Sequence, residues 1–186
     1  MFTKPRPNSR EKRVPKPLTP VRINDLALHY VARFATSGAK LEDYLRRKLR
    51  ERGWEGDGDP DIAALVERFV AAGYIDDEAY ARAKGASLLR RGYGTRRVDQ
   101  TLSAAGIAEE LRNEVRAGPD EQRAAAFAMA KKRRFGPFSA VPPDRPLREK
   151  QLSAMLRAGH PLDLARAVLG AATIAAAEEW VEEESE

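Results

Sequence analysis

The residues in this sequence best suited to chemistry are arginines and lysines grouped in three short clusters. Guanidinium groups bind phosphate oxygens in a bidentate manner, and an aromatic ring among them can stack on an exposed base. The clusters consist of Arg90, Arg91, Tyr93, Arg96 and Arg97; Lys131, Lys132, Arg133 and Arg134; and Arg46, Arg47 and Lys48. They predict a surface that binds a regularly spaced polyanion, such as single-stranded DNA, with Tyr93 placed to stack on a base.

The recurrence of two clusters favours this interpretation. The cluster at 90–97 and the cluster at 131–134 each lie at the end of the opening helix of a predicted unit, so positive charge returns at equivalent places. Two alternatives stay open. The cations could form ordinary solvated helix faces, helped by the negative end of the helix dipole, or they could bind an acidic surface of a partner protein.

Other kinds of chemistry have few candidate residues. The chain has no cysteine, which leaves no disulfide, thiolate metal site or cysteine nucleophile. His29 and His160 lack partners at metal-ligand spacing, and the turn at 92–95 lacks the lysine and the length of a phosphate-binding loop. Asp76 and Asp77 are adjacent at a helix start and point in different directions, which argues against an acid–base pair. We therefore expect no catalytic site, no metal and no cofactor.

The elements that position the clusters are predicted to be helices. Three charged stretches, at 41–53, 95–106 and 147–159, each end in a lone glycine, and Leu49, Leu102 and Met155 lie four positions before those glycines. Alanine, leucine, arginine and glutamate dominate, β-branched residues are few, and apolar residues recur at three-and-four spacing. The sequence predicts an all-α protein of nine helices in three tandem three-helix units, at 22–73, 74–118 and 119–175, which form an elongated, curved body.

The two ends of the chain differ in charge. Residues 1–20 contain six basic groups, one glutamate and five prolines, and residues 178–186 contain six glutamates and no base. We expect a disordered basic tail at 1–21 and an acidic tail at 176–186, which could extend a last helix before it frays. The overall formal charge of +5 then leaves a basic body between the tails. No long apolar run or apolar leader is present, so we expect a cytoplasmic protein with no membrane contact, and a monomer.

The segment from Gly73 to Arg82 closes one helix and opens the next. Gly73 suits the left-handed position after a helix end, where Tyr74 or Ile75 can pack back on the last turn. Asp76 suits the N-cap of the following helix, and the acidic residues after it lie at the positive end of that helix. These structural roles compete with any functional role for the same residues.

This segment, together with a later glycine-rich turn and helix close, resembles the RecX family of recombinase regulators. Members carry a G-[YL]-[LI]-D-D-x-x-[FY]-A motif, then a glycine-rich turn and an L-x-x-x-G-I close. The corresponding residues are Gly73, Tyr74, Ile75, Asp76, Asp77, Tyr80, Ala81, Gly92, Leu102, Gly106 and Ile107. The first unit follows the family's L-x-x-K-L-x-x-x-G pattern at Leu45, Lys48, Leu49 and Gly53. The resemblance covers about residues 24–118, and the proline-rich loop of the third unit departs from the family.

The resemblance to the RecX family implies three tandem three-helix units and a non-enzymatic protein. It further implies binding to the RecA filament on single-stranded DNA, with inhibition or tuning of recombination and ATP turnover in DNA repair. Two other functions stay open: a helix-turn-helix transcription factor that reads duplex DNA, and a helical adaptor whose arginines serve solubility.

Overall fold

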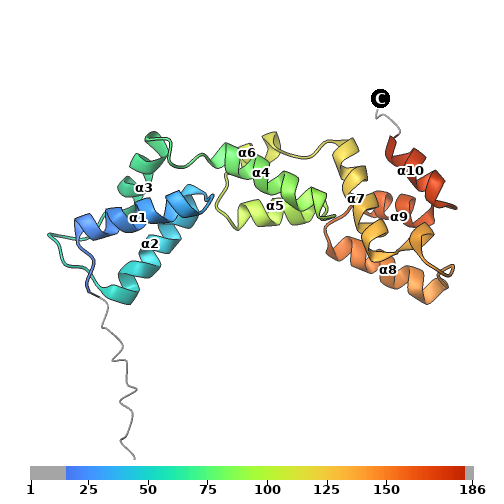
Figure 1. Ribbon diagram of the computed structural model, residues 1–186, viewed down its shortest axis with the longest axis horizontal. Helices are drawn as coiled ribbons and strands as arrows, with labels where there is room; N and C mark the ends of the chain where they lie inside the picture. Colours follow the sequence, from blue (N-terminus) through green and yellow to red (C-terminus); the bar gives the residue numbers. More distant parts are fainter. Residues whose placement is uncertain (1–15, 183–186) are drawn as a thin grey trace, which may run out of the picture.

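The computed structural model describes residues 16–182, and among them it contains ten α-helices, one short 3₁₀ helix and no β-strand (Figure 1). The α-helices are α1 (Pro20–Arg33), α2 (Gly38–Arg52), α3 (Ile62–Ala71), α4 (Asp77–Arg90), α5 (Thr95–Ser103), α6 (Glu109–Glu114), α7 (Pro119–Arg133), α8 (Arg145–Arg157), α9 (Leu162–Gly170) and α10 (Ile174–Glu182). The 3₁₀ helix η1 (Gly136–Phe138) lies between α7 and α8. The predicted all-α class is confirmed.

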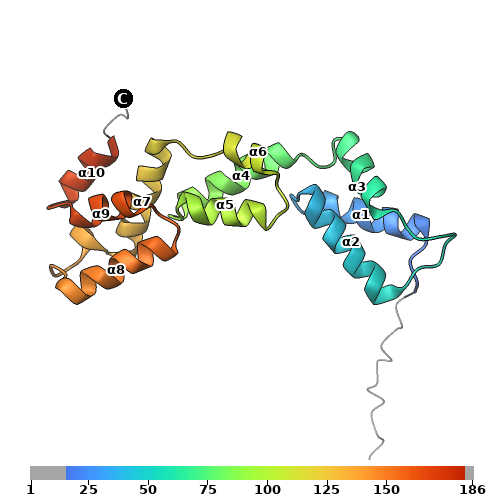
Figure 2. The same cartoon turned by 180° about the vertical axis from the view of Figure 1, so that it is seen from behind.

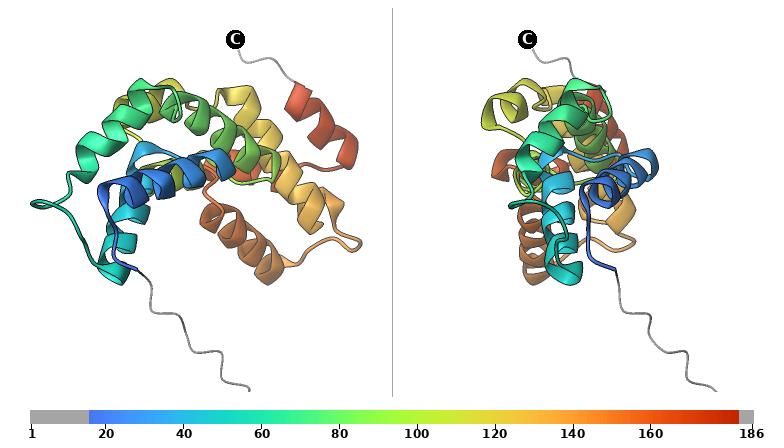
Figure 3. Two further views of the ribbon diagram at one scale, coloured as in Figure 1. Left: turned by 60° about the vertical axis from the view of Figure 1, so that its left-hand side comes forward. Right: turned by 90° about the vertical axis from the view of Figure 1, so that its left-hand side faces the viewer.

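The helices form three groups along the long axis of the molecule, as Figures 1 and 2 show from opposite sides. Each group encloses a separate apolar core: α1–α3 around Leu41 and Leu45, α4–α6 around Leu102 and Ile107, and α7–α10 around Met155. Figure 3 shows that the body is curved, with α2 and α8 projecting on the same side. The predicted tandem, elongated and curved arrangement is confirmed, although the third group contains a fourth helix.

Side-chain caps explain where several helices begin. Ser37, Asp61, Asp76 and Asp144 each precede a helix and accept a hydrogen bond from the backbone N–H three residues later. Such a cap contributes about 1 kcal/mol because it satisfies one of the free N–H groups of the first turn. These caps define the residues at which α2, α3, α4 and α8 begin. Together with the helix lengths, they determine where the basic residues at the helix ends lie.

The predicted basic tail is wrong at its inner end. Residues 1–15 lie outside the described part of the chain, but Leu18 is fully buried in the first core and α1 already begins at Pro20. The Leu18 N–H donates to the carbonyl of Gly53 at 2.9 Å, and the Glu55 N–H donates to the Leu18 carbonyl at 2.8 Å. The prolines around Leu18 predicted disorder for this segment. Burial of the Leu18 side chain instead attaches the segment to the first unit.

The predicted acidic tail at 176–186 is also wrong for residues 176–182. These residues belong to α10, which packs on α7 (Figure 1). Ala177 is fully buried, and Trp180 packs against the third core. The glutamates fill the outer side of the helix, while the small and aromatic residues face inward. Residues 183–186 lie outside the described part of the chain.

None of the helices within residues 16–182 combines the length and apolar character needed to cross a lipid bilayer.

Candidate nucleic-acid interface

The cluster around Tyr93 is organised by the end of α4. Arg90 is the last residue of α4, and Gly92 follows with a φ of +84°, which lets the Tyr93 N–H return to the Leu88 carbonyl at 3.1 Å. The Cζ atom of Arg91 lies 5.4 Å from the centre of the Tyr93 ring, and that ring is half-buried against the second core. A base that stacks here would therefore contact the guanidinium group as well as the ring.

The structure brings this cluster together with part of the next one. A hollow of about 100 Å³ is lined by Arg91 and Tyr93 from the second unit and by Lys132 and Arg133 from α7. The hollow exists because α4 packs on α7. At their meeting point a Cβ on Gly92 would lie only 2.9 Å from the backbone nitrogen of Met129. Clusters that the sequence separates by some forty residues thus form one basic surface.

Backbone contacts fix the joint on which this surface depends. The Gly94 N–H donates to the Ala158 carbonyl at 3.0 Å, and the Arg96 N–H donates to the Gly159 carbonyl at 3.2 Å. No side chain separates the two turns, so their backbones lie close together. Arg96 and its neighbour Arg97 start α5 beside this joint and are exposed.

Lys131 and Arg134 are placed differently from the two residues between them. The amino group of Lys131 lies 3.9 Å from a carboxylate oxygen of Glu178 in α10, and 5.5 Å from the centre of the Phe127 ring. Arg134 has a φ of +56°, in the left-handed region, and ends α7. The predicted cluster at 131–134 is therefore split, and its middle pair faces the second unit.

The third predicted cluster, on α2, is separate from the other two and is partly neutralised. Arg46 pairs with Glu42, whereas Arg47 and Lys48 both pair with Glu51, at 3.8 and 2.6 Å. The hydrogen bond from Lys48 lowers the pKa of Glu51, which keeps the carboxylate charged. In Figure 1, α2 lies at the opposite end of the body from α7. The α2 cluster is thus a helix face of exposed ion pairs, each worth little.

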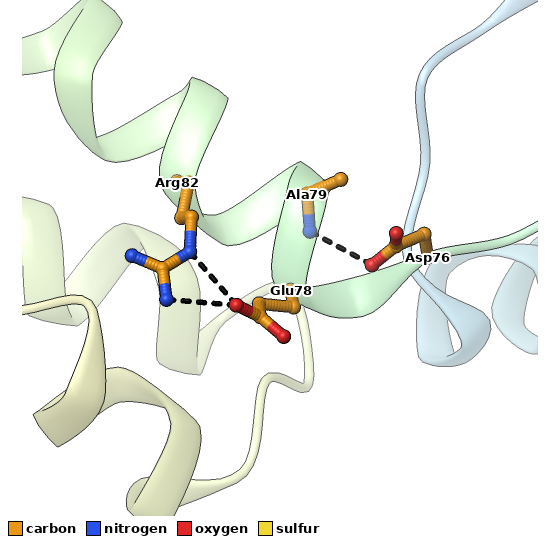
Figure 4. Close-up of polar contacts among 4 residues, drawn as sticks. All are labelled: Asp76, Glu78, Ala79 and Arg82. Atoms are coloured by element: carbon orange, nitrogen blue, oxygen red, sulfur yellow. Dashed lines mark hydrogen bonds and ion pairs between the residues drawn. The ribbon is translucent and has the colours of Figure 1, made fainter.

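The motif between the first two units has structural roles (Figure 4). An Asp76 carboxylate oxygen accepts the Ala79 N–H at 2.8 Å, and one Glu78 oxygen accepts two hydrogen bonds from Arg82 at 2.9 and 2.7 Å. Asp77 instead accepts the Gly38 N–H at 3.0 Å, across the joint between the units. The two aspartates cap and join helices, as their divergent directions predict.

Other motif residues complete the joint between the first and second units. Leu102 and Ile107 are buried in the second core, and Gly106, with a φ of +73°, faces the Cβ of Ala39. Gly73 also adopts the predicted left-handed conformation, with a φ of +74°. A residue that the sequence analysis missed, Ser37, is fully buried here and donates its hydroxyl to the Ala105 carbonyl at 2.5 Å. In the sequence Ser37 stands directly before Gly38, a pattern that is typical of a break between helices and gives no sign of this contact.

The buried histidine at the other joint was also not predicted to have a role. The His160 side chain is almost fully buried, and its Nε2 atom donates to the Gly92 carbonyl at 3.0 Å. Burial lowers its pKa below the ordinary value of 6.5 because the charged ring would lose its hydration. The ring is therefore neutral in the folded joint at neutral pH.

We expect the joint between the second and third units to lose stability as the pH falls below about 6.5. The unfolded chain protonates His160 at a higher pH than the folded chain does, so acid favours unfolding, and above the ordinary pKa the effect disappears. Chemical denaturation of the wild type and of His160→Gln between pH 5 and 8 checks this. The difference in unfolding free energy should shrink on acidification, because glutamine does not titrate. A difference that stays constant would contradict the assignment.

Within residues 16–182 no group of three or more histidine, aspartate or glutamate side chains is arranged to hold a metal ion.

Comparisons with known proteins decide the family. Residues 76–115 match the family model described as the second three-helix domain of RecX. The "Regulatory protein RecX" of Myxococcus xanthus is 33% identical over 175 residues, which cover 88% of this chain and 94% of that protein. This chain belongs to the RecX family. The protein of the same name from Agrobacterium fabrum is 31% identical over 151 residues, which cover 79% of this chain and 81% of that protein.

A solved structure agrees with the fold. The crystal structure of RecX from Lactobacillus salivarius superimposes with a TM-score of 0.63 over 81% of this chain and 94% of that chain, at 18% sequence identity. At this identity the likeness concerns the fold alone. It places the tandem helical units of this chain within the known architecture of the RecX family.

Proposed function

We propose that this RecX-family protein binds the RecA recombinase filament on single-stranded DNA and inhibits its ATPase and recombination activities. The observation that carries the proposal is the convergence of the basic clusters at 90–97 and 131–134 at one joint. Arg91, Tyr93, Lys132 and Arg133 surround a single hollow. The regulatory name of the relatives and the resemblance of the motif to RecX sequences support the choice of partner.

The proposed mechanism is steric and non-enzymatic. A curved body of three units can lie along a polymer and contact neighbouring protomers, which hinders the addition of subunits or the cycle of ATP hydrolysis. The basic surface between the second and third units then binds either the phosphates of the DNA strand or an acidic face of a protomer. Such a protein acts as a monomer, in the cytoplasm, where the filament forms.

We expect the wild type to inhibit the DNA-dependent ATPase of the cognate recombinase in a dose-dependent way. Changing Arg91, Lys132 and Arg133 together to glutamine should weaken inhibition roughly tenfold or more, because three charge-assisted contacts at one place are lost. The measurement is a titration of ATP hydrolysis at a fixed concentration of DNA and recombinase.

The matched control changes Arg46, Arg47 and Lys48 to glutamine. It removes the same charge from a face that already pairs with Glu42 and Glu51, so inhibition should stay near the wild-type level. Equal losses from both triple variants would mean that net charge, rather than the joint, governs binding. No inhibition by the wild type, at concentrations above that of the recombinase, would overturn the proposed function.

A further inference from the structure

A second hollow surface lies at the joint between the first and second units. This groove of about 610 Å³ runs between the end of α1, the segment that leads into α4, and one face of α4. Its lining combines the rings of Phe34 and Tyr74 with the ammonium groups of Lys40 and Lys84, and the small residues of α4 form its floor. Packing between the two units accounts for the joint itself. It does not account for the exposed rings and the cations that line the groove.

The two rings are unusually exposed for their size. Phe34 is 51% exposed and Tyr74 is 57% exposed, whereas aromatic side chains normally bury most of their surface. Each ring is nevertheless held in place from one side. The centre of the Phe34 ring lies 5.3 Å from that of Tyr30, and the centre of the Tyr74 ring lies 5.4 Å from that of Phe69. The Cζ atom of Arg33 lies 5.8 Å from the centre of the Phe34 ring, so a cation accompanies this ring as well. Such positioned rings present their exposed surface at little cost in conformational entropy.

The cations of the groove lack partners of opposite charge. Among residues 16–182, no carboxylate oxygen lies within 4.0 Å of the amino group of Lys40 or Lys84, in contrast to the paired cations of α2. The one carboxylate in the lining, Asp76, is engaged with the N–H of Ala79. Lys40 instead lies 5.8 Å from the centre of the Tyr80 ring. The groove is therefore positively charged and fits a ligand that carries negative charge beside flat apolar groups.

The groove is continuous with the basic surface already described. Lys84, Ser87 and Arg91 follow one another at intervals of three and four, so they share one face across the end of α4. Seven residues of helix span about 10 Å, which is the length of about three stacked nucleotides. Along this face the groove with its two rings leads to Arg91, Tyr93 and the α7 cations.

We propose that this groove binds unpaired bases of a single-stranded nucleic acid. The bases stack on Phe34 and Tyr74, Lys40 and Lys84 bind the neighbouring phosphates, and the same strand continues along α4 to the hollow at Arg91. A repeating polyanion with planar groups matches both the open rings and the succession of cations, whereas an acidic protein segment matches only the cations. The inference rests on the proposed function, because the strand bound in the groove is the single-stranded DNA of the recombinase filament.

The test compares a labelled oligothymidylate of about twelve nucleotides with an abasic strand of equal length, by fluorescence anisotropy with the full chain. The wild type should bind the strand with bases roughly fivefold or more tightly. The double variant Phe34→Leu and Tyr74→Leu should lose most of this preference, because it keeps apolar volume but loses two of the flat faces and leaves only Tyr93 for stacking. Leu147→Ala, at an exposed apolar position on α8, is the control and should keep the wild-type preference.

A second variant separates charge from stacking. Lys40→Gln with Lys84→Gln should reduce the slope of log affinity against log salt by about 1.4 in magnitude, since two phosphate contacts are lost. Lys150→Gln, at an exposed position on α8, should leave the slope nearly unchanged. Photocrosslinking with an iododeoxyuridine-containing strand gives an independent readout, and the crosslinked peptides should contain Phe34 or Tyr74.

Failure of this inference and failure of the proposed function give different results. A wild type that inhibits the recombinase but binds both strands equally would overturn the groove assignment and leave the function intact. The same holds if the leucine variant loses inhibition while its preference for bases is unchanged, because the groove would then bind protein. Base-dependent binding without any inhibition would support the groove and overturn the filament role.

Discussion

Replacing Gly159 by alanine is expected to lower the free energy of unfolding by roughly 2–5 kcal/mol. A Cβ at this position would lie 2.4 Å from the backbone nitrogen of Arg97, and a backbone atom cannot rotate away as a side chain can. Overpacking of this kind costs about 1–3 kcal/mol, and the φ of +95° adds about 1–2 kcal/mol for a residue with a side chain. In a chain of this length, the midpoint of thermal unfolding should fall by roughly 5–15 °C.

The loss should be concentrated at the joint between the second and third units. Hydrogen exchange should accelerate in α5 and α8, which meet there, and remain near wild type in α1 and α2, because stability in tandem units is carried mainly by neighbouring contacts. Gly170→Ala is the matched control. A Cβ there meets nothing within 4 Å, so the same chemical change should have almost no effect. Equal losses at Gly159 and Gly170 would contradict the close backbone approach.

The Gly159→Ala variant also links stability to function. The joint holds Arg91 and Tyr93 beside Lys132 and Arg133, so opening it separates the cations without removing any of them. Inhibition of the recombinase should therefore weaken at temperatures where each helical unit is still folded. A variant that is destabilised but inhibits as well as the wild type would show that the two clusters act independently.

The helical repeat was predictable because its signals are local. Apolar residues at three-and-four spacing define the helices, and Asp76 and Gly73 define the break between two of them. The same local rules led to the interpretation of Asp76 and Asp77 as structural residues, and the observed hydrogen bonds agree with it.

The shape of the candidate site was not predictable from such signals. The meeting of Arg91 with Lys132 depends on the angle at which α4 packs on α7, and that angle depends on Gly92, Gly94 and Gly159. In the sequence these glycines predict turns, but which backbone each one approaches is a property of the assembled units. The buried Ser37 and His160 escaped notice for the same reason, since their partners are both 68 residues away.

The C-terminal segment shows how charge can conceal a helix that contributes to a core. Six glutamates in the last nine residues predict an acidic tail that at most extends a last helix and then frays, but charge on one helix face is compatible with burial of the other. Ala177 and Trp180 are three positions apart and lie on the inner face, so α10 packs on α7 while Glu178 pairs with Lys131. The segment therefore helps to stabilise the helix that carries Lys132 and Arg133.

Trp180→Ala is accordingly expected to destabilise the third unit by about 2–4 kcal/mol, somewhat less than a fully buried tryptophan because the side chain is only half-buried. Glu179→Ala, one position earlier and exposed, is the control and should change stability by less than about 0.5 kcal/mol. Denaturant titrations followed by far-ultraviolet circular dichroism check both variants. If residues 176–182 were a solvated tail, the two substitutions would be equally silent, whereas a loss confined to Trp180→Ala requires a packed helix.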